Sequence, residues 1–483
     1  MKSPFVKTIC FALLAALVSS IAAAYYPWPE RVVESEMVGK PLFEPYDTSA
    51  VFKIRILEFD RDKESLEQIT LERKGEKWTI PASNKFVANN ATQIAVVAKS
   101  LNELTVLSEE SSDSEAFLDK GVVDPSKYES TTDRSALGTK LILEDHKGRR
   151  IASLIVGSSL KDEDNSLKNH FVRVPGQPTV YQVEFNKSSL ATDFTRWVDP
   201  DLFGFKQRAP SVAPGVIGID DYRVTPAGPG SESGMKRNYE AEFQFTQGGL
   251  GISKFAKQES AGKLQEYEPS QSLARQFAAM GGQLGNIKFH DVRKKPAKLA
   301  KAMRQPTTTV EDSVFEPLKE IGFVKKGYQE QSFDFEAVGG EVYVRHGDGV
   351  KVTLHIGDVA TGTISDNLRV SLHVMVTAGV DESIFETPQT PEDPKDKEYL
   401  RKLKERNDAI KAASIRATGL NQLHANWIYL VPEDVIENIR PDIEIGDAQP
   451  IADDSAEVSQ DKPAEEKVEE KAEEPEAANS DSN

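Results

Sequence analysis

The chain has 483 residues, of which 39% are hydrophobic and 28% charged, with 59 Lys and Arg against 77 Asp and Glu. The apolar content excludes disorder along the whole chain, and the length predicts two or three domains. The net charge of −18 argues against nucleic-acid binding, because such proteins need a basic face to displace phosphate counterions. The one cysteine, Cys10, lies in the N-terminal apolar segment, so disulfide and thiol chemistry are excluded for the rest of the chain.

Residues 1–24 have the composition of a targeting segment. Lys2 and Lys7 precede an apolar stretch that continues to Ala24, which is the order of a secretory signal. The small residues before Tyr25 form a cleavage pattern, whereas an uncleaved membrane anchor of about 20 residues is the alternative. Both interpretations place the body of the protein outside the cytoplasm, on the periplasmic side.

After a connector (residues 25–49), residues 50–205 are predicted to form a first α+β module. Short runs of alternating apolar and polar residues, separated by Gly-containing turns, predict β-hairpins. Asn90 precedes apolar residues at helical spacing and is expected to cap a helix, and a shorter helix is expected to end at Gly121. Two further hairpins complete the module.

The same order of elements recurs in residues 206–446. Ser270 is expected to cap a helix, and Gly322 ends a short helix as Gly121 does in the first half. The sequence therefore predicts a divergent tandem repeat. Because hairpins outnumber crossovers, the expected fold is α+β, with two modules of mainly antiparallel sheet and covering helices.

Two segments depart from this repeat. Residues 392–417 are predicted to form a long helix inserted into the second module, with Pro394 in its first turn and Gly419 just past its end. Residues 447–483 contain 13 acidic residues and 3 lysines, a net charge of −10, without apolar periodicity. We expect a disordered acidic tail there.

The sequence contains no motif for a catalytic site. Phosphate-binding loops, dinucleotide fingerprints, zinc-protease motifs and nucleophile elbows are absent. His355 and His373 are the best metal candidates, because both fall on the polar positions of neighbouring predicted strands. A metal needs at least a third ligand, and the sequence places none, so we expect two histidines on a solvated sheet face. We therefore predict no catalytic residues, no metal and no cofactor, and we interpret His346 as a turn residue.

The inserted helix is basic within an acidic protein. From Lys395 to Arg416 it carries eight Lys and Arg against four Asp and Glu, a net charge of +4. The candidate interaction surface consists of Arg401, Lys402, Lys404, Arg406 and Lys411. It would dock an acidic partner, the chain's own tail or membrane headgroups, and the alternative is a solvated helix stabilised by i,i+4 ion pairs.

The first module resembles an uncharacterised bacterial family, domain of unknown function 4340. The resemblance rests on the following residues: Ile69-Thr70-Leu71-Glu72-Arg73 with Trp78, the helix after Asn90, Phe117 to Pro125, Leu141 to Gly157, Phe171-Val172-Arg173 and Val180-Tyr181-Gln182-Val183. The resemblance implies an N-terminal membrane segment and tandem modules outside the cytoplasm, often beside transporter components of the gliding-associated ABC type. It implies no catalytic residues, and the long insertion and acidic tail depart from it.

These features favour a non-enzymatic extracytoplasmic accessory protein. It would associate with the membrane through its N-terminal segment and bind an envelope or transporter protein. The alternatives are an exported hydrolase that uses carboxylates and a secreted structural or glycan-binding protein.

Overall fold

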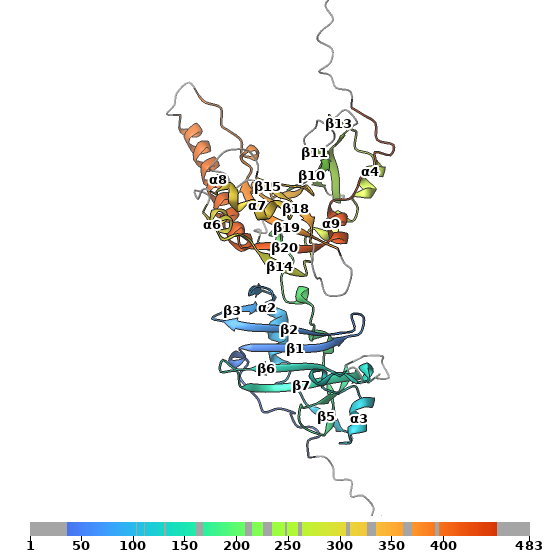
Figure 1. The fold of residues 1–483 in the computed structure, drawn as a ribbon. Helices are drawn as coiled ribbons and strands as arrows, with labels where there is room; N and C mark the ends of the chain where they lie inside the picture. Colours follow the sequence, from blue (N-terminus) through green and yellow to red (C-terminus); the bar gives the residue numbers. More distant parts are fainter. Residues whose placement is uncertain are drawn as a thin grey trace, which may run out of the picture.

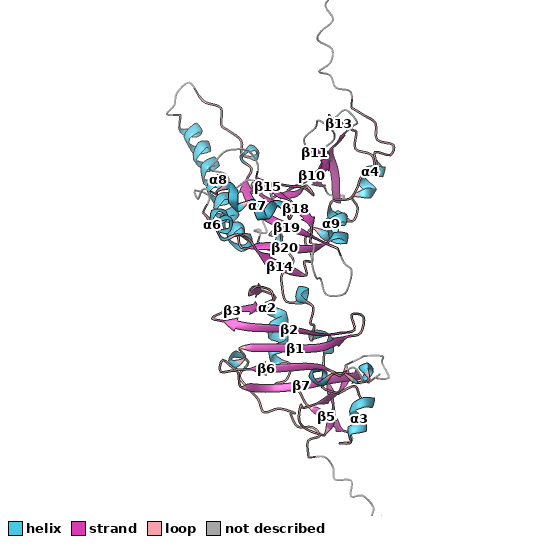
Figure 2. Cartoon of the chain, in the orientation of Figure 1, coloured by secondary structure: helices cyan, strands magenta, loops and turns pink. Residues whose placement is uncertain are grey.

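The structure is a computed structural model. It describes residues 36–451 except for residues 103, 111, 130–131, 161–167, 208–214, 226–233, 247–248, 259–262, 306–309, 326–334, 361–369 and 392–395. The predicted N-terminal targeting segment lies outside the described residues, as does nearly all of the predicted acidic tail. Two nine-stranded antiparallel sheets with covering helices make up the described chain (Figure 2), which confirms the predicted α+β class.

The first sheet has the strand order β4-β3-β2-β1-β6-β7-β8-β9-β5. Its strands are β1 (Lys53–Asp60), β2 (Ser65–Lys74), β3 (Lys77–Ile80), β4 (Phe86–Ala88), β5 (Val106–Glu109), β6 (Thr139–Glu144), β7 (Arg150–Ser159), β8 (Asn169–Arg173) and β9 (Val180–Glu184). The helices are α2 (Ala91–Lys99) and α3 (Ser114–Asp119), with short 3-10 turns between the strands.

The second sheet has the strand order β13-β12-β11-β10-β17-β18-β19-β20-β14. Its strands are β10 (Val216–Thr225), β11 (Gly234–Thr246), β12 (Gly249–Gln258), β13 (Leu264–Glu266), β14 (Asp291–Lys294), β17 (Glu341–Arg345), β18 (Val350–Val359), β19 (Ser371–Val380) and β20 (Trp427–Pro432). A separate two-stranded sheet consists of β15 (Phe323–Lys325) and β16 (Phe335–Ala337). The helices are α4 (Gln271–Gln276), α5 (Met280–Gln283), α6 (Ala297–Arg304), α7 (Glu316–Lys319), α8 (Lys397–His424) and α9 (Glu433–Ile439).

The two large sheets have the same topology. The strands β1–β5 correspond to β10–β14, and β6–β9 correspond to β17–β20. With this correspondence the two strand orders are identical. The register matches as well, because buried Ile56 pairs with Leu141 in the first sheet and buried Ile219 pairs with Val342 in the second. The predicted repeat of modules is therefore confirmed at the level of sheet architecture.

Local sequence signals explain several elements. The Asn90 side chain accepts a hydrogen bond from the Gln93 amide and caps α2, which buries Ile94 and Val97 against the sheet. Ser270 caps α4 in the same way through the Leu273 amide. These caps occupy corresponding places in the two modules.

An aromatic cluster joins the two modules. Phe86, at the edge of the first sheet, contacts Phe289, Trp427 and Tyr429 of the second module, with ring centroids 5.8, 4.9 and 6.3 Å away. Phe194 adds a contact to Phe289 at 5.7 Å. The modules stack through this junction, with β3 near β14 (Figure 1).

The turn residue His346 belongs to a second contact between the modules. It is almost fully buried, its Nε2 lies 3.1 Å from the Phe203 carbonyl oxygen, and its ring packs against Phe205. Sequence reasoning placed His346 in a turn but did not predict its burial. The residue connects the end of the first module to the second.

The inserted helix differs from its predicted bounds of 392–417. It begins at Lys397, where Asp396 accepts a hydrogen bond from the Tyr399 amide, and it continues to His424. Gly419, predicted just past the end, lies inside the helix. Burial of Leu420 and Asn421 against the sheet offsets the cost of a helical glycine, about 1 kcal/mol.

The start of the predicted tail is also different. Residues 447–451 are described and pack beside β13, where the Glu268 amide donates to the Gln449 carbonyl and the Ile451 amide donates to the Glu266 carbonyl. The prediction of an unstructured chain from Asp447 onward was therefore wrong for these five residues. In the described part of the chain, no helix is both long and apolar enough to cross a membrane.

Candidate interaction surface

The long helix α8 has two halves with different environments. Its buried residues all lie in the C-terminal half, namely Ala413, Ala417, Leu420, Asn421 and His424. The Asn421 side chain bonds both the amide and the carbonyl of Ala378 on β19 (2.8 and 2.7 Å), which fixes this half to the sheet. The N-terminal half has no buried residue and projects away from the sheet (Figure 1).

Three of the five predicted surface cations form ion pairs with neighbouring carboxylates. Arg401 pairs with Glu405 at 2.8 Å and Lys402 pairs with Glu398 at 3.1 Å, both at i,i+4 spacing. Arg406 lies 3.4 Å from Glu382 of the preceding segment. This part of the surface agrees with the alternative interpretation, a solvated helix that is stabilised by ion pairs.

The other two predicted cations lie on a continuous exposed stripe. Lys404 and Lys411 are exposed, and within the described residues neither has an ion-pair partner. At 100° per residue they share one helix face with Leu400, Asp408 and Ile415. Leu400 is 47% exposed and Ile415 is 66% exposed. We call these five residues the outer stripe of α8.

An open groove lies on another side of the projecting half. Its volume is about 1070 Å³, and it lies between α8 and the segment Ile384–Pro391. The charges that line it are mixed, because Glu386, Asp396 and Glu398 face Arg401 and Lys402 there. The groove therefore does not concentrate positive charge, and the unpaired lysines lie on the outer stripe.

The histidines expected on a solvated sheet face are buried instead. His355 is 4% exposed, and its two ring nitrogens lie 2.9 Å from Glu341 Oε1 and 2.8 Å from Thr377 Oγ1. The strand β18 is buried on both faces because the small β15–β16 sheet packs on the side that alternation marked as polar. Residues of α6 and α7 cover the neighbouring part of that face, around Met375 of β19. The prediction of a solvated face was therefore wrong.

His373 is buried to the same degree, and its hydrogen bonds define its state. Its Nδ1 lies 2.9 Å from the Asp358 carbonyl oxygen and its Nε2 lies 2.9 Å from the Arg293 guanidinium. Arg293 can only donate, so Nε2 accepts and the ring is neutral. Burial, and then Arg293, lower the pKa of His373. Across the described residues, no group of three or more potential metal ligands occurs.

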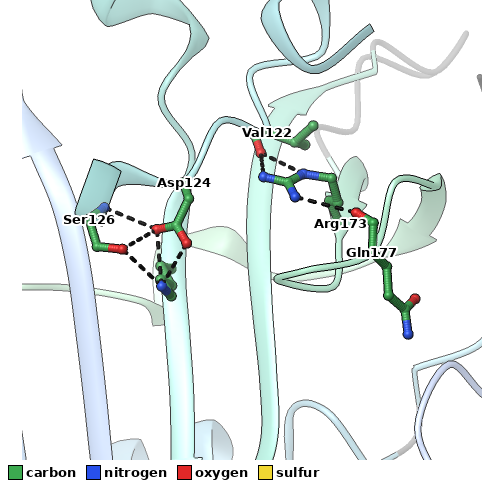
Figure 3. Close-up of polar contacts among 6 residues, drawn as sticks. Val122, Asp124, Ser126, Arg173 and Gln177 are labelled. Carbon is green, nitrogen blue, oxygen red and sulfur yellow. Dashed lines mark hydrogen bonds and ion pairs between the residues drawn. The ribbon is translucent and has the colours of Figure 1, made fainter. Parts of the chain in front are cut away.

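Sequence reasoning missed a buried ion pair in the first module. Lys140 Nζ lies 2.7 Å from Asp124 Oδ2, and both residues are 8% exposed. Ser126 also bonds the Asp124 carboxylate through its amide and hydroxyl (Figure 3). Beside this pair, the Arg173 guanidinium donates to the Val122 carbonyl at 2.9 Å (Figure 3). These bonds fasten the segment before β6 to the sheet, so their role is structural.

The second module buries three titratable side chains together. Lys295 is 5% exposed, and its ammonium lies 3.2 Å from both Met303 Sδ and the His424 carbonyl oxygen. His424 Nδ1 lies 2.7 Å from the Tyr429 hydroxyl. Burial lowers the pKa of Lys295 to about 7, and among the described residues no carboxylate pairs with it. No periodic pattern in the sequence marks this lysine as buried.

Fold and surface together define a tandem α+β protein that presents a projecting helix. Residues 44–215 match the model of the family described as Domain of unknown function (DUF4340). The resemblance expected from the first module is therefore confirmed over that stretch. No curated protein and no solved structure matches the chain.

Proposed function

We propose that the protein is a non-enzymatic extracytoplasmic accessory protein that is held at the membrane through its N-terminal segment. It binds another envelope or transporter component through the outer stripe of α8. The single observation that carries this proposal is the outer stripe, which combines two exposed apolar side chains with the unpaired lysines Lys404 and Lys411. Protein interfaces commonly combine an apolar centre with a polar rim.

The arrangement of the modules supports a partner surface that lies away from the membrane. The described chain begins beside β5, where the Gly39 amide bonds the Val106 carbonyl and the Leu42 amide bonds the Leu104 carbonyl. This point lies at the far end of the first module, whereas α8 projects from the opposite end of the second (Figure 1). A membrane segment at the N-terminus would therefore hold α8 away from the bilayer, where it meets a partner rather than headgroups.

Charge and shape of the outer stripe predict the chemistry of the partner. The lysines favour an acidic surface, and Leu400 and Ile415 need an apolar contact between or beside the acidic groups. A stable interface also needs more area than one helix stripe provides, about 1,200 Å² in total. The groove next to the segment Ile384–Pro391 adds surface on the same projecting half.

The test is co-purification from detergent-solubilised native membranes with K404E/K411E and L400S/I415S variants of the full chain. Both variants should lose the partner that the unaltered protein retains. A K127E/K147E variant, which reverses two lysines of the first module, should retain it. Equal recovery of the partner with all three variants would rule out the outer stripe as the binding surface.

A further inference from the structure

A small polar cavity lies in the first module, separate from α8. Its volume is about 320 Å³, at the lower end of the range for small-molecule sites. The polar residues that line it come from distant parts of the chain and include Glu58, Asp60, Arg61, Arg134, Thr139 and Lys187. The cavity thus depends on the fold, because the end of β1, the start of β6 and the turn after β9 meet there.

The two carboxylates of the cavity are already engaged by the protein. Glu58 accepts a hydrogen bond from the Thr139 hydroxyl at 2.9 Å. Asp60 accepts hydrogen bonds from the amides of Asp62 and Lys63 at 2.9 and 3.1 Å and lies 3.5 Å from the Lys63 ammonium. Each carboxylate thus has partners within the protein, although Glu58 keeps acceptor sites that the Thr139 hydroxyl does not occupy.

The cations, in contrast, have unused hydrogen-bond donors. Within the described residues, the Lys187 ammonium makes one long hydrogen bond, to the Gly157 carbonyl at 3.3 Å, and it has three donors in all. In the described part of the chain, Arg61 makes no side-chain hydrogen bond or close ion pair, although its guanidinium has five donors. Its charge also acts on the exposed carboxyl of Asp133 and helps to lower its pKa. Arg134 pairs with Glu64 outside the cavity and also lies over the Phe59 ring.

Burial and the neighbouring charges reinforce this imbalance. Burial lowers the pKa of the Lys187 ammonium, Glu58 opposes that shift and Arg61 adds to it. A second positive charge beside a partly buried ammonium is unfavourable unless an anion lies between them. Glu58 supplies part of that negative charge, and the lining as a whole carries the three cations Arg61, Arg134 and Lys187 against the two carboxylates Glu58 and Asp60, a net positive charge.

The second module has a carboxylate at the corresponding place, and that carboxylate has partners in the chain itself. Asp221 lies two positions after Ile219, as Glu58 lies two positions after Ile56, and the two isoleucines are equivalent in register. Arg440 forms an ion pair with Asp221, and the Asn238 amide donates to the same carboxylate at 2.7 Å. In the second module, the carboxylate at the position of Glu58 is thus paired with a cation of the chain itself.

We propose that the cavity of the first module binds a small molecule through an oxyanion group, a carboxylate or a phosphate, held by Lys187 and Arg61. Guanidinium groups bind both oxyanions through paired N–H donors, and the ammonium adds a point charge. The apolar surface available to the rest of the ligand is small, so a compact ligand fits. The site acts independently of the partner surface on α8.

The test is calorimetric titration of the full chain at low ionic strength with acetate, succinate and inorganic phosphate as separate probes. At least one probe should bind saturably at one site per chain, and the tighter probe identifies the oxyanion. Lys187→Gln and Arg61→Gln should each weaken binding at least about tenfold, the usual effect of losing a charged hydrogen bond. Lys147→Gln removes an exposed lysine from the same module and should leave binding unchanged.

Two results would overturn the proposal. One is the absence of saturable binding of all three probes, and the other is equal loss of affinity in the Lys147→Gln control, which indicates a general charge effect. If Lys187→Gln unfolds the protein, Arg61→Gln remains decisive, because Arg61 is exposed and its removal leaves no buried gap. Lys187→Arg should retain binding, since the positive charge stays in the cavity.

Discussion

Gly157 and Gly357 occupy the same position in the two sheets, each against the backbone that follows a short helix. A Cβ atom would lie 2.3 Å from the Lys120 carbonyl oxygen at Gly157 and 2.3 Å from the Ile321 carbonyl oxygen at Gly357. The next residue of each strand bonds that same carbonyl, at 2.9 Å in both modules. Close backbone contact at this point is therefore a shared feature of the repeat.

The first prediction follows from that contact. Gly157→Ala and Gly357→Ala should each lower the free energy of unfolding by about 1–3 kcal/mol, because backbone must move to accept the methyl group. Denaturant unfolding measures this. Gly379→Ala, where no atom lies within 4 Å of the new Cβ, is the control and should stay within about 0.5 kcal/mol of the parent. Equal effects at all three positions would contradict the proposed contact.

The buried ion pair of the first module gives a second prediction. Lys140→Met should destabilise the protein by about 3–5 kcal/mol, because it leaves the Asp124 carboxylate buried without its partner. Lys140→Met with Asp124→Leu should cost clearly less than Lys140→Met alone. If the double variant is as unstable as the single one, the loss comes from packing rather than from an uncompensated charge.

The effect of pH on stability gives an independent check of the comparison between Lys140→Met and the double variant. Burial alone raises the pKa of this carboxyl, but Lys140 and then Ser126 outweigh burial and lower it below 3.8. The stability contributed by the carboxylate is therefore present above about pH 4 and is lost as pH falls through the lowered pKa. Asp124→Asn should flatten the acid limb of the stability curve.

Lys295 predicts a pH effect in the opposite range. Its pKa is lowered to about 7, so between pH 7 and 10.5 the unfolded chain binds the proton and the folded chain does not. Stability should therefore rise as pH rises through this interval, by up to roughly 3–5 kcal/mol. Lys295→Met should remove this rise, as measured by thermal unfolding across the interval. Burial raises the pKa of Tyr429, which stays neutral there. If stability still rises by the same amount in Lys295→Met, another titrating group causes the rise.

The aromatic junction predicts how the modules unfold. Phe86→Ala removes contacts with Phe289, Trp427 and Tyr429, which should cost about 3–5 kcal/mol and uncouple the two modules. Calorimetry should then show two separate transitions. Leu107→Ala, at a 46% exposed site in the first module, should leave the parent profile intact. A single lowered transition in Phe86→Ala would show that the junction does not hold independent modules together.

The sequence predicts those features of the structure that depend on residues close together in the chain, and it misses features that depend on distant contacts. Gly121 and Gly322 end short helices with positive φ angles of 66° and 88°, as local sequence indicates, and the order of hairpins gave the repeated sheets. The burial of His355 was not predicted, because alternation reveals one apolar face and cannot show that the β15–β16 sheet covers the other. The end of α8 was misplaced because burial of Leu420 overrides the local preference of Gly419.

The candidate sites show the same limit. The basic character of α8 is visible in the sequence, but which lysines remain unpaired depends on the neighbours that folding brings close, such as Glu382 beside Arg406. The cavity of the first module joins Arg61 to Lys187 across more than a hundred residues, and no spacing rule connects such positions. Pattern analysis finds elements, whereas these sites arise from the contacts between elements.

The central claim is that the outer stripe of α8 contacts a partner. The most direct measurement places a photo-crosslinking amino acid at Lys404 of the full chain in native membranes, with Lys147 as the control position. We predict one discrete crosslinked adduct from position 404 that disappears when Leu400 and Ile415 are changed to serine, and no such adduct from position 147. Absence of an adduct at 404, or the same adduct from both positions, would contradict the account.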